Sequence, residues 1–172
     1  MLYQRIETFI EYTGRAIAWL TLAMVLIMFA VVVLRFAFNL GWIWLQESVN
    51  YLHAYVFMLG AAYTLKRDAH VRVDIFYGAM SVKRRSLVDL LGTLLLLLPF
   101  CGFIFYVSWD EVIKSWQALE SSQQTGGLDF AYLLKTSMLL MPLLLFIQGL
   151  AMIIRNIMIL RGTNSCSDPE PG

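Results

Sequence analysis

The stretch AIAWLTLAMVLIMFAVVVL, residues 16–34, contains no charged residue and decides the class of the fold. A helix rises by about 1.5 Å per residue, so a stretch of this length spans roughly the 30 Å hydrocarbon core of a bilayer. Three more stretches lack charge over a similar length: Ser48–Leu65, Leu90–Trp109 and Thr136–Ile154. The sequence therefore predicts an all-α integral membrane protein with four transmembrane helices.

The composition excludes several other classes of protein. Of the 172 residues, 59% are hydrophobic and only 15% are charged, and the mean hydropathy is +0.68. A soluble domain needs more charge on its surface, and a net charge of +1 gives no field that would attract nucleic acid. Cys101 and Cys166 lie at different predicted depths, so we expect both to be reduced. Soluble enzymes, nucleic-acid binders and disulfide-rich secreted domains are therefore excluded as main classes.

The lysines and arginines predict the orientation in the membrane. Ten of the 13 precede the first charge-free stretch, lie between the second and the third, or follow the fourth. Since cytoplasmic loops carry the excess of Lys and Arg, both termini and the middle loop are predicted to be cytoplasmic. No small-residue cleavage site follows the first stretch, which we expect to stay in the mature chain.

These patterns divide the chain into three predicted regions. Residues 1–15 place apolar side chains at helical spacing and predict a short amphipathic helix on the cytoplasmic surface. Residues 16–160 form the predicted four-helix transmembrane domain. Residues 161–172 are polar, contain two prolines and are expected to form a disordered cytoplasmic tail.

Polar residues around the start of the second helix are the main candidates for a site. Arg35 and Glu47 lie on the same predicted side, so we expect an ion pair that fixes the first hairpin, rather than a substrate or proton site. Asn50 and Tyr51 continue the helix face of Glu47. Amide and small side chains are common where membrane helices pack, so this face is predicted to pack on the first helix or on another protein. A transport pathway is the alternative.

The sequence shows no recognisable catalytic arrangement. It has no GxSxG or HExxH motif and no phosphate-binding glycine loop after a strand. His53 and His70 differ in predicted depth by roughly 25 Å at the helical rise, so one haem iron cannot bind both. We therefore expect no enzymatic activity, no cofactor, and no catalytic, substrate-binding or metal-binding residues. A membrane redox subunit is the alternative, which an absorption spectrum would reveal.

Four motifs carry a resemblance to a known family. They are LRFAFNLGWIWLQE at residues 34–47, HVRVD at 70–74, GTLLLLLPF at 92–100 and SWQALESSQQTGGL at 115–128. In this order they resemble the small membrane subunit, the DctQ-type component, of tripartite ATP-independent periplasmic (TRAP) transporters. The last motif is similar to the subgroup for mannitol or chloroaromatic compounds. About 130 of the 172 residues are covered, and HVRVD is the most specific motif.

The resemblance implies a small permease subunit of a sodium-driven transporter for organic acids in the bacterial inner membrane. It implies three partners: the large TRAP membrane subunit, a periplasmic substrate-binding protein and the lipid bilayer. The chain would pack on the scaffold of the large subunit, stabilise it and help dock the binding protein. Residues expected to have structural or subunit-interface roles are Arg35, Trp44, Glu47, Asn50, Tyr51, His70, Arg72 and Asp74. Residues expected to contact the binding protein are Trp116, Glu120, Gly126 and Gly127.

The rival function is a self-sufficient four-helix exporter that couples to protons and acts as a dimer. Such an exporter needs an acidic group deep in the membrane, where protonation and substrate binding compete. Glu47 lies at the predicted membrane edge and meets this requirement poorly. Transport by the isolated protein in liposomes would favour the exporter over the subunit.

Overall fold

The computed structural model describes residues 2–67 and 80–161 of the chain. Every regular element in these residues is a helix, which confirms the predicted all-α class. The elements are α1 (Leu2–Phe38), α2 (Ile43–Lys66), α4 (Val82–Gly92), η1 (Thr93–Leu97), α5 (Leu98–Ala118) and α6 (Ala131–Leu160).

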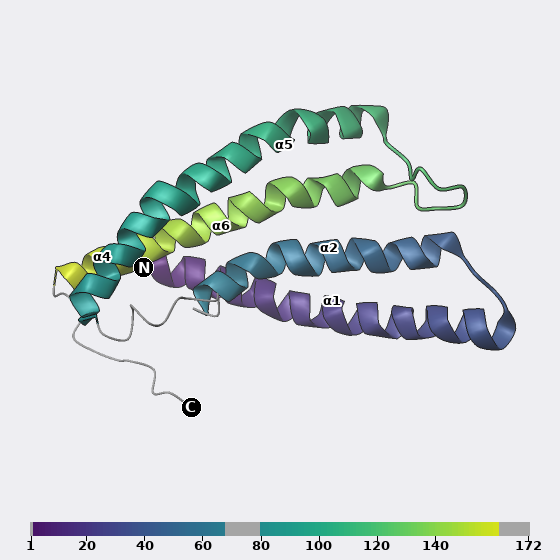
Figure 1. Cartoon of the computed structure of the whole chain (residues 1–172), viewed down its shortest axis with the longest axis horizontal. Coiled ribbons are helices and arrows are strands. Elements are labelled where there is room, and N and C mark those ends of the chain that lie inside the picture. Colours follow the sequence, from purple (N-terminus) through teal and green to yellow (C-terminus); the bar gives the residue numbers. More distant parts are fainter. Residues whose placement is uncertain (1, 68–79, 162–172) are drawn as a thin grey trace.

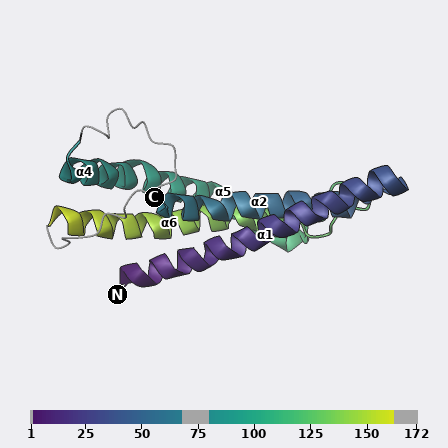
Figure 2. The same ribbon diagram turned by 90° about the horizontal axis from the view of Figure 1, so that it is seen from below.

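The helices form a flat layer of long, roughly antiparallel rods. Across the layer the order is α1, α2, α6 and α5 (Figure 1), and a view at right angles shows that the layer is thin (Figure 2). In agreement with this order, α2 packs against both α1 and α6, and α5 packs against α6. Helix α4, the π-helical turn η1 and α5 follow one another without a break. The layer consequently has two central helices, α2 and α6, and two outer ones.

Within the described parts of the chain, three helical segments are long and apolar enough to cross a membrane. They are Thr8–Phe38, the continuous run Val82–Ala118, and Ala131–Leu160. Helix α2 has the length, with 24 residues, but is not among the three. Polar side chains within it, Asn50 and His53 among them, lower its hydropathy. Three of the four expected segments are therefore candidate membrane spans by length and hydropathy, and a fourth crossing is not confirmed.

The first helix is longer than its charge-free stretch. Residues 1–15, expected to be a separate surface helix, run directly into the transmembrane stretch, because α1 is unbroken from Leu2 to Phe38. Gly14 would permit a break but is helical and lies against the Tyr63 ring of α2. The expected disordered tail lies outside the described residues apart from Arg161.

Burial is concentrated on the central helix α6. Its buried residues include Leu144 and Leu145, which join Ile10 of α1, Ala62 of α2 and Cys101 of α5 in one apolar core. The apolar stretch of α1, by contrast, is unburied, and Trp19 is 73% exposed. Surface of this kind would be unfavourable in water but suits contact with hydrocarbon or with another membrane helix.

Pro99 accounts for the irregular turn between α4 and α5. A proline has no N–H to donate and its ring meets the carbonyl oxygen four residues earlier, here that of Leu95. The helix responds by widening into the π-helical turn η1, within which Leu95 lies. The long run from α4 to α5 is visibly curved (Figure 1).

Candidate functional site

Polar side chains gather at both ends of the layer, and the end with the more extensive hydrogen bonding is called the Glu47 end. It comprises the α1–α2 turn, residues 39–42, and the α5–α6 loop, residues 119–130, with the helix ends beside them. The opposite end, called the Glu11 end, contains the beginnings of α1 and α4 and the last turns of α2 and α6 (Figure 1).

The α5–α6 loop is closed by its own backbone. The N–H of Ala131 donates to the carbonyl of Glu120 at 3.0 Å, and the N–H of Ser122 donates to the carbonyl of Leu128 at 3.0 Å. At the tip, the N–H of Gly127 donates to the carbonyl of Gln124 at 3.0 Å. These cross-loop bonds give the segment a defined shape, which its polar composition alone does not predict.

Two glycines permit this shape for different reasons. Gly126 has a φ of +83°, a conformation that a side chain strongly disfavours and that the third residue of a type II turn requires. Gly127 is needed for space, because an added Cβ would lie 2.5 Å from Ser122 Oγ and 2.6 Å from Glu47 Oε2. Both residues, expected from sequence to face a binding protein, thus also determine how the loop folds.

Glu47 fastens the loop to the second turn of α2. One of its carboxylate oxygens accepts a hydrogen bond from the Ser122 hydroxyl, and the other accepts one from the N–H of Leu128 at 2.6 Å. Hydrogen bonds to an ionised acceptor are stronger than those between neutral groups. A single side chain therefore joins the first helical hairpin to the loop of the second.

A network of charges joins α5 to α6 beside the loop. Lys135 Nζ lies 2.7 Å from a carboxylate oxygen of Glu111 and 2.7 Å from one of Glu120, and the Ser115 hydroxyl donates to Glu120 at 2.6 Å. The hydrogen bond from Lys135, together with that from Ser115, lowers the pKa of Glu120. Glu120 is thus held as a carboxylate at the point where α5 ends.

Aromatic side chains fix the start of α6. The indole N–H of Trp116 donates to the Thr136 hydroxyl at 2.9 Å, and its ring packs on Tyr132 with 4.7 Å between ring centroids. From α2, the Tyr55 hydroxyl donates to the carbonyl of Leu133 at 2.6 Å. Trp116, expected to contact a binding protein, is therefore also part of the α5–α6 packing.

The expected ion pair between Arg35 and Glu47 is wrong. Glu47 is instead hydrogen-bonded to the α5–α6 loop, and Arg35 is exposed at the end of α1. The chain turns directly after Phe38, where Asn39 adopts a positive φ and Leu40 donates its N–H back to the carbonyl of Leu34.

The other predicted residues have separate positions. Trp44 stacks on Trp42, with 6.1 Å between ring centroids, at the α1–α2 turn. On α2, Asn50 is exposed and Tyr51 is half-buried. His70, Arg72 and Asp74 lie outside the described residues.

The Glu11 end has a charge cluster that the sequence analysis missed. Glu11 of α1 binds Lys66 and Arg67 of α2, each at 2.9 Å, and the guanidinium of Arg67 also donates to the Tyr63 hydroxyl at 3.1 Å. The partners are more than 50 residues apart, so spacing in the sequence gave no signal beyond opposite charges at two predicted helix ends. The hairpin α1–α2 is held by this cluster rather than by Arg35.

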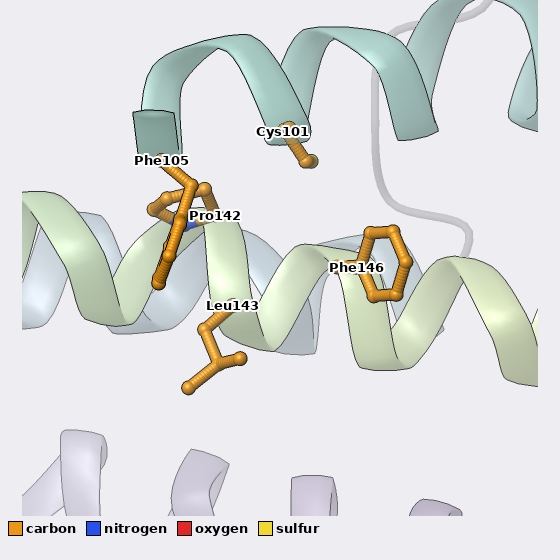
Figure 3. Close-up of a pocket in the computed structure, with 6 residues that line it drawn as sticks. Cys101, Phe105, Pro142, Leu143 and Phe146 are labelled. Carbon is orange, nitrogen blue, oxygen red and sulfur yellow. The ribbon is translucent and has the colours of Figure 1, made fainter. Parts of the chain in front are cut away.

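An apolar groove lies between α5 and α6 at the level of Pro142. Its volume is about 220 Å³, and Cys101, Gly102, Phe105, Pro142, Leu143 and Phe146 line it. Figure 3 shows Phe105 extending from α5 beside Pro142 of α6. The groove offers no cationic side chain or amide with which to bind a carboxylate, so its chemistry suits hydrocarbon and not an organic anion.

The fold and its polar ends define a class of protein. It is a helical membrane protein whose charged and hydrogen-bonded groups tie helix ends together. In residues 2–67 and 80–161, no three His, Cys, Asp or Glu side chains are grouped to hold a metal ion.

The chain belongs to the family described as tripartite ATP-independent periplasmic transporters, DctQ component, which matches residues 24–159. Its members are components of transporters.

One curated relative is the C4-dicarboxylate TRAP transporter small permease protein DctQ of Vibrio cholerae serotype O1. The two are 30% identical over 94 residues, which are 55% of this chain and 40% of the relative. The match thus spans less than half of the relative's length. No solved structure is recognisably similar to the chain.

Proposed function

We propose that this chain is the small permease subunit of a sodium-driven TRAP transporter for organic acids. In this role it packs on and stabilises the scaffold of the large membrane subunit, and it helps dock the periplasmic substrate-binding protein. The observation that carries the proposal is the fastening of the α5–α6 loop by Glu47 within a chain of the DctQ family. This arrangement gives a rigid polar surface at one end of a membrane layer.

The geometry supports four membrane crossings. Helix α2 runs antiparallel to α1 over its length (Figure 1). Its last turn binds Glu11 near the beginning of α1, and its first turn follows the end of α1 after four residues. If α1 crosses the bilayer, α2 must cross it too. The polar side chains of α2 are tolerated because α2 lies between α1 and α6.

The orientation follows from the positive-inside rule. The Glu11 end contains Lys83, Arg84 and Arg85 at the beginning of α4 and Arg161 directly after α6. Because cytoplasmic segments carry the excess of Lys and Arg, these cations support the proposal that the Glu11 end, and with it both ends of the chain, is cytoplasmic. The Glu47 end then faces the periplasm of a bacterial inner membrane, which is the compartment of a periplasmic binding protein.

The loop tip is the proposed docking surface. Gln123, Gln124, Thr125 and Gly126 are exposed, and Trp116 and Glu120 lie at the base of the loop, where they contact α5 and α6. The cross-loop hydrogen bonds order this tip before any partner arrives, which lowers the entropy cost of binding. Preorganisation of this kind is the property that a docking loop needs.

The outer faces of the layer are the proposed contact with the large subunit. Helix α1 exposes a continuous row of large apolar side chains, and a partner membrane helix would bury them. Arg35 lies near the end of α1, and Trp44, Asn50 and Tyr51 lie in the first turns of α2; these residues are proposed to border the contact. His70, Arg72 and Asp74 remain proposed cytoplasmic contacts.

The solute is proposed only as an organic acid. The name of the Vibrio relative specifies C4-dicarboxylates, whereas the loop motif resembles the subgroup for mannitol or chloroaromatic compounds. The described groove between α5 and α6 has no group that would select among them. On this proposal the choice of solute rests with the binding protein and the large subunit.

The first test of this proposal is copurification. The tagged chain, expressed with its neighbouring genes and extracted in mild detergent, should bring down a much larger membrane protein. Sodium-gradient uptake by the reconstituted complex should fall when the chain is left out. Isolation of a homodimer that transports protons and a solute by itself would overturn the proposal and favour the exporter.

A second test addresses the docking surface. A photo-reactive side chain at Thr125 should crosslink the binding protein, and the same side chain at Lys83, at the opposite end, should not. Equal crosslinking from both positions, or none from Thr125, would contradict docking at the loop tip.

A further inference from the structure

The beginning of α4 combines positive charge with an exposed apolar surface. Lys83, Arg84 and Arg85 are all exposed in its first turn. Arg84 is followed at helical spacing by Leu87, Val88 and Leu91, which are 48%, 42% and 47% exposed. A cation therefore stands at the head of an apolar stripe that continues toward the middle of the membrane span.

The end of α6 adds a further cation to the same region. Helices α4 and α6 pack antiparallel, and Asp89 lies with Met152, Arg155 and Asn156 around one small hollow. Val82 is seven residues before Asp89 in α4, and Arg161 is five to nine residues after Asn156 and Met152 of α6. Because the two helices run in opposite directions, Val82 lies at about the same level as Arg161. Both views show the start of α4 beside the last turns of α6 (Figures 1 and 2). Arg161 is exposed.

The apolar part of the surface continues beyond α4. Leu94 and Leu95 in η1 are 50% and 65% exposed and extend the row formed by Leu87, Val88 and Leu91. The complete surface, called the α4 stripe, consists of Lys83, Arg84, Arg161, Leu87, Val88, Leu91, Leu94 and Leu95. Its cations lie in the first turn of α4 and directly after α6, and its leucines lie further along the candidate span Val82–Ala118.

We propose that the α4 stripe binds an anionic phospholipid. The phosphate of the headgroup would accept hydrogen bonds from Lys83, Arg84 and Arg161, and one acyl chain would lie along the leucines. Charge complementarity selects an anionic headgroup over a zwitterionic one, because a zwitterionic headgroup carries its own cation, which neutralises the phosphate and is repelled by Lys83, Arg84 and Arg161. The attached apolar stripe selects a lipid over a free phosphate, which would leave the leucines unused.

The stripe differs from the other end of the molecule in a way that supports this choice. At the Glu47 end Lys135 is bound by the carboxylates of Glu111 and Glu120, so its charge is already matched. The exposed cations Arg35 and Lys114 of that end lie apart, on the two outer helices α1 and α5. At the Glu11 end Lys66 and Arg67 are matched by Glu11. Lys83 and Arg84 begin a helix whose first turn contains no acidic residue.

The test uses the purified full chain in detergent and native mass spectrometry. Phosphatidylglycerol and phosphatidylcholine with identical acyl chains are titrated separately, and soluble glycerol 3-phosphate is the third probe. Phosphatidylglycerol should be retained more tightly than phosphatidylcholine, and glycerol 3-phosphate should neither bind nor compete at the same concentration. Equal retention of the two lipids, or competition by glycerol 3-phosphate, would overturn the proposal.

Two matched double variants locate the site. Lys83→Gln with Arg84→Gln should weaken phosphatidylglycerol binding about twentyfold to thirtyfold, since each cation near a membrane surface contributes about fivefold. Arg35→Gln with Lys114→Gln removes two exposed cations from the Glu47 end and should leave binding within about twofold. Equal losses in both pairs would mean that net charge, and not the α4 stripe, holds the lipid.

Two more variants separate lipid binding from folding. Lys83→Arg with Arg84→Lys keeps the charges and should keep the affinity, and Leu91→Gln should weaken both lipids alike. All variants are checked for an unchanged helical circular dichroism spectrum. Loss of binding in the charge-conserving variant would contradict recognition by these cations.

Discussion

Gly127 lies where the loop tip, Ser122 and Glu47 converge. Alanine at this position would place a Cβ 2.5 Å from Ser122 Oγ and 2.6 Å from Glu47 Oε2, so both hydrogen-bonding groups would have to move. We expect Gly127→Ala to destabilise the protein by about 1–3 kcal/mol, the usual range for overpacking. Thermal unfolding in detergent measures the change. Gly41→Ala, at the same end but with no atom within 4 Å of the new Cβ, is the control.

Glu47 is the residue whose removal should free the loop. It accepts hydrogen bonds from Ser122 and Leu128, and replacement by alanine leaves both donors without this acceptor. Because charge-assisted bonds are worth about 1.5–3 kcal/mol each, amide hydrogen exchange in residues 119–130 should rise tenfold or more in Glu47→Ala. Asp110→Ala removes an exposed carboxylate near the same end and should not change the exchange.

The same variant also tests the proposed role in transport. In the reconstituted complex Glu47→Ala should lower assembly or uptake but leave the order of preferred solutes unchanged. A changed solute preference would mean that Glu47 contacts the solute, and unchanged exchange in the loop would mean that Glu47 does not hold it.

At this scale the sequence identifies the residue but not its partner. Glu47 is expected from its place at a predicted helix edge to have a structural role, and in the structure its carboxylate accepts hydrogen bonds from the α5–α6 loop. Its partners are 75 and 81 residues away in the chain, on a loop whose shape depends on Gly126 and Gly127. Spacing in the sequence suggests Arg35 as the partner of Glu47 because the two residues are close in the chain. That spacing contains no information about how the α5–α6 loop folds back onto α2.

Among the elements, the α1–α2 hairpin depends on one close approach. Gly14 of α1 lies against the ring of Tyr63, and an added Cβ would come within 3.0 Å of three ring carbons. Gly14→Ala should therefore push α2 away and weaken the pairs between Glu11 and Lys66 and Arg67, lowering stability by about 1–3 kcal/mol.

Gly60→Ala in α2 is the matched control. This variant adds the same methyl group to the same hairpin, but no atom lies within 4 Å of the new Cβ. Alanine is also more favourable than glycine inside a helix, by about 1 kcal/mol. Thermal unfolding should thus separate the two variants in opposite directions. Similar losses in both would show that helix packing at Gly14 is not what limits this hairpin.

The charge-free stretches locate the helices but not their ends. Each stretch lies almost wholly inside a helical run, whereas the helices extend past charged residues such as Glu11 and Glu111. Those charges are tolerated because they are paired with Lys66 and Lys135 on neighbouring helices. The hydropathy of one segment contains no information about these pairs. A prediction from hydropathy therefore ends each helix before its paired charges, and α2 falls below the hydropathy of the three candidate spans.

At the scale of the whole molecule, the flat layer explains why so little surface is buried. Helices α2 and α6 are central (Figures 1 and 2), and α1 contacts both of them, but its apolar stretch and the outer side of α5 are left open. In water this would be unstable, but a bilayer imposes no hydrophobic cost on exposed leucine. A layer of this shape can add to the flank of a larger membrane protein by one face and still meet lipid on the other.

The side of the bilayer that each loop faces depends on whether α2 crosses it. If α2 spans the bilayer, the α1–α2 turn and the α5–α6 loop face the periplasm together and the start of α4 faces the cytoplasm. In full-length variants, Gly41→Cys and Thr125→Cys should react with a membrane-impermeant maleimide in intact spheroplasts. Lys83→Cys should react only after lysis, and unsubstituted protein gives the background from Cys101 and Cys166. Reaction of Gly41→Cys and Lys83→Cys on the same side would mean that α2 does not cross, and the orientation proposed for the Glu47 end would fail with it.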